Sequence, residues 1–147
     1  ARALGGKVTR NPAKEIGWGR VDVLQNDVAA EWFGAALRFF DSFHWHGETF
    51  SIPPGATRIL SSPHCENQAF TLGPHLGMQC HVEMTPELIR AWCQDWGKEV
   101  ESLARRMPSV QTPAQMTERI EERVVELNAV ADRIYDRWRA GLAIGDV

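Results

Sequence analysis

Apolar and polar positions alternate through much of the first half of the chain, a pattern typical of β-strands. The expected strands are Lys7–Arg10, Glu15–Leu24, Phe39–Trp45, Thr57–Ser61, Gln68–Leu72 and Leu76–His81. The alternation of the second strand shifts near Arg20. Asp27 can cap a short helix that extends to about Leu37. The first half therefore predicts strands with short connections and one short helix.

The second half changes to a helical period. Thr85 can cap a helix that has Pro86 at its first position and the apolar stripe Leu88, Ile89, Trp92 and Trp96. Thr112 and Gln115 have the spacing of a capping box, which predicts a second helix to about Ala140 that ends at Gly141. Its stripe, expected to pack in the core, is Met116, Ile120, Val124, Leu127, Ala131, Ile134 and Trp138. Strands followed by helices predict one α/β or α+β domain.

Composition and charge narrow the classes of function. The 147 residues suffice for one domain with its own core, and the net charge of −3 with scattered Lys and Arg gives no case for binding nucleic acid. Apolar runs are too short to cross a membrane. The cysteines are odd in number and have no CxxC pairing, which favours free thiols in the reducing cytoplasm. A cytoplasmic location without membrane contact is the expectation.

The stretch GMQCHVEMT places a histidine and a glutamate two residues apart, at His81 and Glu83. Residues i and i+2 of a strand point to the same face, so the carboxylate can accept a hydrogen bond from one ring nitrogen while the other faces a substrate or nucleophile. That arrangement is the base and its orienting acid in a catalytic triad. On the spacing alone, however, such residues are more often an ordinary surface pair.

Two further histidines, His44 and His46, also share a strand face. With Cys65 or His81 they could bind zinc, but their spacing is not that of a zinc site, so we predict no metal site. A core or hydrogen-bonded role for His44 is favoured. Cys80 directly precedes His81 and should point to the opposite face, as a buried thiol and not a nucleophile.

A family resemblance extends over essentially the whole chain. The segments FHWHGETFSIPPGATRILSSPHCENQAF and GMQCHVEMT resemble the C-terminal two thirds of a class I glutamine amidotransferase, of the kind found as the amidotransferase domain of GMP synthase. The opening ARALGGKVTRNPAKEIGW resembles the segment that follows the nucleophile in that family. The resemblance implies an α/β fold with a flavodoxin-like or Rossmann-like sheet flanked by helices. Residues 1–147 would form one partial amidotransferase-like domain.

The resemblance also implies a Cys-His-Glu triad, in which His81 matches the histidine and Glu83 the glutamate. The family usually has proline after the histidine and an aromatic residue before it, where this chain has Val82 and Cys80. These differences change the packing but leave both catalytic side chains in place.

A second matching segment implies the substrate site. It corresponds to the strand-end turn whose backbone holds glutamine, and its residues are Trp45, His46, Gly47 and Glu48. Aspartate is commoner in the family at the position of Glu48. Without the resemblance, Glu48 would be read equally well as a solvated loop acid.

The nucleophile of the family is not found in this sequence. It lies in a G-x-C-x-G turn, and no such motif occurs here. The letters ARAL before Gly5 and Gly6 also read as the last turn of a helix with its glycine C-cap, with no helix start before it. Both features lead us to expect that the chain is truncated, without the nucleophile segment and the first strands of the sheet.

The implied activity is hydrolysis of the glutamine side-chain amide, with the ammonia passed to a synthase domain or subunit. The resemblance requires no metal or organic cofactor. A γ-glutamyl peptide hydrolase of the same fold remains an alternative. Another is a catalytically inert amidotransferase-like module whose C-terminal helix packs on a partner.

Overall fold

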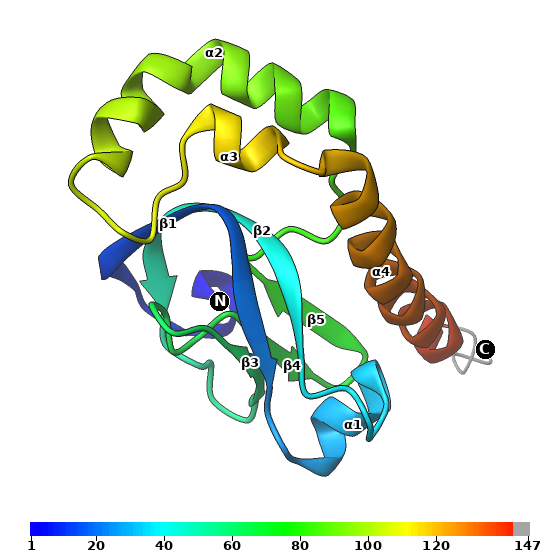
Figure 1. Ribbon diagram of the computed structural model, residues 1–147. Helices are drawn as coiled ribbons and strands as arrows, with labels where there is room; N and C mark the ends of the chain where they lie inside the picture. Colours follow the sequence, from blue (N-terminus) through cyan, green and yellow to red (C-terminus); the bar gives the residue numbers. More distant parts are fainter. Residues whose placement is uncertain (143–147) are drawn as a thin grey trace.

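A five-stranded antiparallel sheet contains most of the first half of the chain in the computed structural model, which describes residues 1–142 (Figure 1). Its spatial order is β2-β1-β3-β4-β5. The strands are β1 (Val8–Val23), β2 (Phe39–Phe50), β3 (Thr57–Ser61), β4 (Ala69–Leu72) and β5 (His75–Met78). The prediction for β3 is confirmed at both ends, and that for β4 within one residue. The predicted combination of a sheet with flanking helices is also confirmed.

Strand β1 unites two segments that the sequence predicted as separate strands. Its ladder with β2 changes register between Arg10 and Glu15, and not near Arg20 as expected. The Asn11 side chain supports this irregular stretch by donating to the carbonyls of Ala13 at 2.7 Å and His64 at 2.9 Å. One long strand is possible because these side-chain bonds replace part of the missing ladder.

Strand β2 is longer than predicted. The sequence predicted a turn at Trp45–Glu48, but the ladder continues through it, with His46 opposite Glu15 and Glu48 opposite Arg10. The expected strand-end turn is therefore wrong. Strand β1 decides this, because it extends far enough to pair with Trp45, His46 and Glu48.

Two helices begin at short polar caps. In α1 (Asp27–Phe33) the cap is Asn26, not Asp27 as predicted, since the Asn26 side chain accepts from the Ala29 N–H at 2.8 Å. That helix ends at Gly34, before the predicted limit of Leu37. In α2 (Pro86–Ala104) the Thr85 cap is confirmed: its hydroxyl accepts from the Leu88 N–H at 3.2 Å.

The predicted C-terminal helix is interrupted. The capping box of Thr112 and Gln115 is confirmed, but it begins only the short α3 (Pro113–Thr117). A second helix, α4 (Ile120–Leu142), follows after Arg119, whose φ of 53° is left-handed and breaks the helical path. The break redirects the chain, so α4 leaves α3 at an angle (Figure 1). The predicted end at Gly141 is wrong, because α4 includes that residue.

The sheet is strongly curled, so that its two edges nearly meet. Gln79 still donates its N–H to the Gln68 carbonyl beside β4, and two residues later His81 pairs with Phe43 of β2, at the opposite edge. Two residues span at most about 7 Å. A flat sheet would hold β2 and β4 about 14 Å apart, since they are three strand spacings from each other. The curl therefore encloses the side chains on the inner face.

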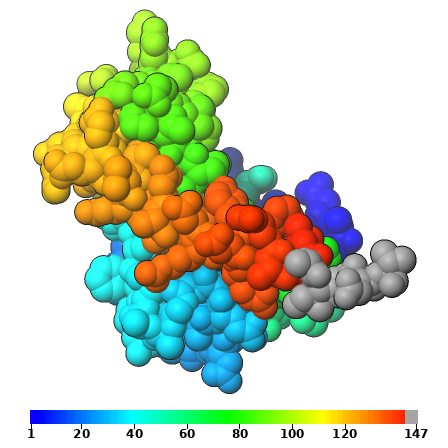
Figure 2. Space-filling model, turned by 90° about the vertical axis from the view of Figure 1, so that its right-hand side faces the viewer, coloured from blue at the N-terminus to red at the C-terminus, as the bar shows by residue number. Residues whose placement is uncertain are grey.

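Helices cover the outer surface of this curled sheet. Helix α4 lies across α1 and β2, as Figure 2 shows, and its residues Val124, Leu127 and Ile134 are buried there. Arg137 of α4 pairs with Glu31 of α1 at 2.8 Å. The prediction of a core position is wrong for Trp138, which is 43% exposed. No helix among the described residues has the length and apolar character needed to cross a membrane.

Candidate functional site

The pair of His81 and Glu83 lies beside the edge of the sheet. His81 is three residues past the end of β5 and not within a strand, contrary to the predicted strand Leu76–His81. Two backbone hydrogen bonds join it to Phe43: the His81 N–H donates at 2.8 Å, and the Phe43 N–H donates at 3.2 Å. The Ser42 hydroxyl also donates to the His81 carbonyl at 2.8 Å. The position of the imidazole is thus set by β2.

The two side chains form a close hydrogen bond. His81 Nδ1 lies 2.7 Å from Glu83 Oε1, and the Val82 N–H donates to Glu83 Oε2 at 3.0 Å. Partial burial tends to raise the pKa of Glu83, but the hydrogen bond from His81 and the backbone donors outweigh it, so the pKa is lowered. Glu83 therefore stays ionised near neutral pH. The His81 side chain is 29% exposed, so solvent can reach it.

Trp92 of α2 lies against the imidazole and joins it to a group of tryptophans. Trp92 packs edge-on against His81, with ring centroids 5.4 Å apart, and against Trp45 at 5.2 Å. Trp45 also approaches Trp96 at 5.9 Å. Trp92 thus stands between His81 and Trp45. An apolar wall of this kind limits the access of water on one side of the pair.

The predicted substrate segment divides between the two faces of β2. Trp45, His46 and Gly47 help to line a cavity of about 210 Å³ against α2, but neither His81 nor Glu83 lines it. His46 points to the other face, where it meets Glu15, while Glu48 is exposed. Three of the four predicted residues thus share one cavity wall, and Trp92 contacts both Trp45 of that wall and His81. The segment is extended and not a turn, so strand alternation directs the His46 ring away from the Trp45 ring.

The cysteines of the chain are poorly placed to attack a substrate. Burial raises the pKa of the Cys80 thiol to about 12, and burial also raises the pKa of Cys93. Cys65 is buried and its sulfur lies 3.3 Å from the Thr49 hydroxyl. A thiolate is the reactive form, so burial makes the Cys80 thiol inert and disfavours the thiolate of the half-buried Cys93. All three are free of disulfides.

A second histidine–carboxylate cluster occupies the inner face of the sheet. Glu15 Oε2 lies 3.1 Å from His46 Nε2 and accepts from Gln68 Nε2 at 2.7 Å. The Ser62 hydroxyl donates to Glu15 Oε1 at 2.8 Å. Burial tends to raise the pKa of Glu15, but the hydrogen bond from His46, the charge of His44 and the Ser62 hydroxyl outweigh it and lower the pKa.

His44 completes this inner cluster. Burial lowers its pKa to about 4, against the opposing effect of Glu15. Sequence reasoning named His44 and His46 but missed Glu15 and Gln68. The available signal was a lone carboxylate, Glu15, at the start of the otherwise apolar stretch EIGW. Neither Cys65 nor His81 joins the cluster, so the zinc grouping considered from the sequence is not the one that the fold assembles.

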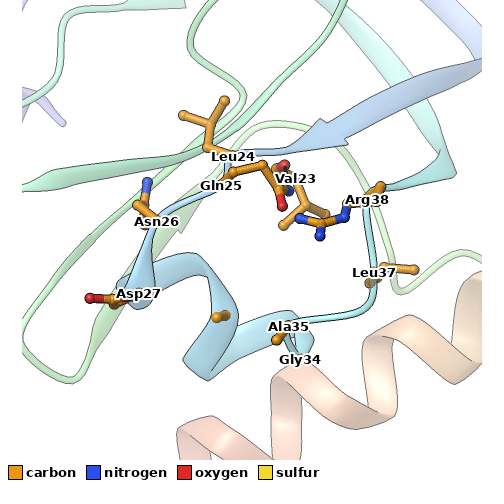
Figure 3. A pocket seen from close by; sticks show the side chains of 10 residues that line it. Val23, Leu24, Gln25, Asn26, Asp27, Gly34, Ala35, Leu37 and Arg38 are labelled. Atoms are coloured by element: carbon orange, nitrogen blue, oxygen red, sulfur yellow. Dashed lines mark hydrogen bonds between the residues drawn. The ribbon is translucent and has the colours of Figure 1, made fainter.

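Another hollow lies between the end of β1, helix α1 and the start of β2. It measures about 250 Å³, and Figure 3 shows Asn26 and Arg38 on its rim. None of the residues that the sequence predicted for catalysis or substrate binding lines it. The hollow is therefore separate from the predicted site.

Two solved structures with the same fold are glutamine amidotransferases. One from Methylobacillus flagellatus is 41% identical, with a TM-score of 0.91 over 96% of this chain and 58% of its own. One from Thermotoga maritima is 28% identical, with a TM-score of 0.80 over 93% of this chain and 56% of its own. The present chain thus spans less than three fifths of the length of either protein.

A more distant structure, a candidate GMP synthase subunit from Thermoplasma acidophilum, is 24% identical. Its TM-score is 0.51 over 57% of this chain and 42% of its own, which bears on the fold alone. No protein-family model matches the sequence, and a search of curated proteins gave no match.

The chain has the fold of the class I glutamine amidotransferases, over the part of that fold that its residues span. The resemblance found in the sequence is thereby confirmed at the level of the fold.

Proposed function

We propose that the protein to which this chain belongs hydrolyses the side-chain amide of glutamine with a Cys-His-Glu triad. In this proposal His81 is the general base and Glu83 holds its ring. The observation that carries the proposal is the 2.7 Å bond from His81 Nδ1 to Glu83, which leaves Nε2 for the nucleophile. The similarity to two glutamine amidotransferase structures supports the substrate class.

The proposed reaction proceeds through a thioester. A cysteine thiolate attacks the amide carbon, and His81 donates its proton to the departing ammonia. Water then loses a proton to His81 and cleaves the γ-glutamyl thioester. Glu83 fixes the tautomer of His81 and stabilises the imidazolium that is present before ammonia departs and again after water has lost its proton. The product ammonia would pass to an accepting synthase domain or subunit.

The nucleophile in this proposal comes from a segment outside the 147 residues, so that residues 1–147 are one part of the amidotransferase domain. Two observations support this. Burial of Cys80 and Cys93 raises the pKa of each thiol, and the chain matches only 58% of the Methylobacillus structure. The free thiols further support our proposal of a cytoplasmic location.

Trp45, His46, Gly47 and Glu48 are proposed to contribute to glutamine binding, in divided roles. Trp45 and Gly47 face the cavity against α2 and would contact the substrate directly. His46 is bonded to Glu15 on the inner face and would hold the strand in place. Glu48 accepts the His46 Nδ1 bond on its backbone carbonyl, at 3.0 Å.

The test measures ammonia released from glutamine by the longer protein that contains these residues, and by the 147-residue chain alone. Because triad members act as a unit, His81→Ala should lower kcat of the longer protein by at least about 10³-fold, and Glu83→Gln by about 10²–10⁴-fold. His64→Ala is the matched control, since His64 is exposed and distant in sequence from the pair. It should leave kcat unchanged.

Two outcomes would contradict the proposal. Full activity of the longer protein after His81→Ala would mean that His81 is not the general base. Robust turnover by the 147-residue chain, abolished by His81→Ala, would mean that one of its own cysteines is the nucleophile.

A further inference from the structure

The inner face of the sheet gathers three metal-ligating side chains that the proposed hydrolysis does not use directly. Glu15 comes from β1, and His44 and His46 come from β2. One ligand atom from each lies within 4.8 Å of the others, and no other such group occurs among residues 1–142. Glu15 is 4% exposed and His44 is 1% exposed. Two imidazoles and a carboxylate therefore face one another away from bulk solvent.

The hydrogen bonds of His46 favour a cation beside Glu15. The Nδ1 of His46 lies 3.0 Å from the Glu48 carbonyl, which can only accept, so Nδ1 carries the proton of the neutral ring. Its Nε2 then holds a lone pair, yet lies 3.1 Å from Glu15 Oε2, another acceptor. The Gln68 amide nitrogen lies 2.7 Å from Glu15 Oε2 and 3.3 Å from His46 Nε2, so one neutral donor serves both acceptors. A proton on Nε2 or a metal ion would stabilise their close approach further.

The ring of His44 has a matching arrangement. Its Nε2 lies 3.3 Å from the Gly19 carbonyl, while Nδ1 is buried and has no hydrogen-bond partner. The edge with Cδ2 and Nε2 rests against Gly19, so Nδ1 is on the opposite edge. His44 is paired with Gly17, and Glu15 lies on the other side of Gly17 from Gly19. The unpartnered nitrogen is thus on the side of Glu15.

Surrounding groups orient all three side chains, as in established metal sites. Metal-binding histidines usually donate the second ring N–H to a carbonyl or carboxylate, which fixes the tautomer. Here the Gly19 and Glu48 carbonyls accept those bonds. The Ser62 hydroxyl and the Gln68 amide hold the carboxylate of Glu15. Gln68 Oε1 is itself buried without a partner.

The spacing and access are also compatible with an ion. Ligand atoms of a tetrahedral site with bonds of about 2.1 Å lie about 3.4 Å apart, close to the separation of His46 and Glu15. A cavity of about 150 Å³ has Glu15, His44 and His64 in its lining, which gives water a route to a fourth position.

We propose that Glu15, His44 and His46 bind one Zn²⁺ ion, with water as the fourth ligand. Two imidazoles and one carboxylate suit zinc, whereas Mg²⁺ and Ca²⁺ prefer oxygen ligands. The ion would join β1 to β2 just after the irregular register between Arg10 and Glu15. Its role is to fix the inner face of the curled sheet, whatever reaction the His81 side supports.

The test adds ZnCl₂ to the metal-free, chelator-treated 147-residue chain and measures stoichiometry and affinity by calorimetry. One ion per chain should bind and raise Tm, because a ligand that binds only the folded state stabilises it. Glu15→Gln and His44→Gln should each weaken binding at least tenfold. His64→Gln is the matched control: it alters the same cavity but removes no proposed ligand, so affinity should be unchanged.

X-ray absorption on the Zn²⁺-loaded wild-type chain keeps the proposal testable even where a variant unfolds. The spectrum should show only nitrogen and oxygen ligands at about 2.0–2.1 Å, with scattering from two imidazoles. A sulfur ligand at about 2.3 Å would place the ion on a cysteine and overturn the proposal. Absence of binding, or unchanged affinity in folded Glu15→Gln, would overturn it as well.

Discussion

Two histidine–carboxylate pairs flank β2, one on each side of the strand. His81 and Glu83 are 2.7 Å apart in partly exposed surroundings, whereas His46 and Glu15 are 3.1 Å apart inside the curled sheet. The glutamate of the first pair is 48% exposed at its side chain, that of the second 5%. The residue types are the same, but only the outer pair is open to a substrate, while the inner one is enclosed by Gln68 and Ser62.

The comparison shows how burial changes what such a pair does. A carboxylate in water is stabilised by solvent, so an exposed pair adds little to stability. A buried carboxylate depends on its few partners, because removal of one leaves another charge or polar atom without compensation. Changes to the outer pair should therefore affect reactivity more than stability, whereas changes to the inner pair should destabilise the fold.

The largest expected difference concerns removal of each carboxylate. Glu15→Ala should lower the free energy of unfolding by about 3–5 kcal/mol, because His46, Gln68 and Ser62 lose their common partner. Glu83→Ala should cost at most about 1 kcal/mol. Urea unfolding of both variants and the wild-type chain, in the presence of a chelator, measures this. Equal losses would mean that the two pairs do not differ in their dependence on the fold.

A second expected effect is a pH dependence of the free energy of unfolding that comes from the inner cluster. Burial holds the pKa of His44 at about 4, below the ordinary 6.5, so the unfolded chain binds a proton between these values that the folded chain does not. Stability contributed by neutral His44 is present above pH 6.5 and is lost as the pH falls towards 4. Between pH 7 and pH 5 the loss should be about 2 kcal/mol.

Urea unfolding at both pH values, again with a chelator, checks this. His44→Gln should reduce the loss, because glutamine does not titrate. The lowered pKa of Glu15 and of Glu83 costs stability only as the pH falls below about 4.5, outside the measured range. A variant with the same pH dependence as the wild-type chain would show that His44 is not the group responsible.

The smallest expected effect concerns two glycines, one against the buried His44 ring and one against a flexible side chain. A Cβ at Gly19 would lie 3.0 Å from Cδ2 of buried His44, whereas one at Gly47 would lie 3.0 Å from the flexible side chain of Lys14. Gly19→Ala should cost about 1–3 kcal/mol, since the imidazole has little room to move. Gly47→Ala should change stability by at most about 0.5 kcal/mol. Thermal unfolding of the paired variants checks the ranking, and a reversed order would contradict it.

Several features of the molecule could be predicted from the sequence because local interactions determine them. Thr85 caps α2, and Thr112 forms the capping box of α3, since each hydroxyl reaches an N–H only a few residues away. The segment Thr57–Ser61 is a strand because its pattern and its bounding turns agree. His81 and Glu83 meet because they are two residues apart, and the matching motifs around them indicated the amidotransferase fold.

Tertiary structure decided the features that depend on distant partners. The length of β2 was set by β1, which bonds to the segment that the sequence read as a turn. His81 left β5 to pair with Phe43 because the sheet curls until its edges nearly meet. The same curl brought Gln68, beside β4, to Glu15 of β1 and His46 of β2, across strands that are not neighbours. Periodicity and capping report contacts within a few residues, whereas such long-range contacts exist only once the sheet has closed on itself.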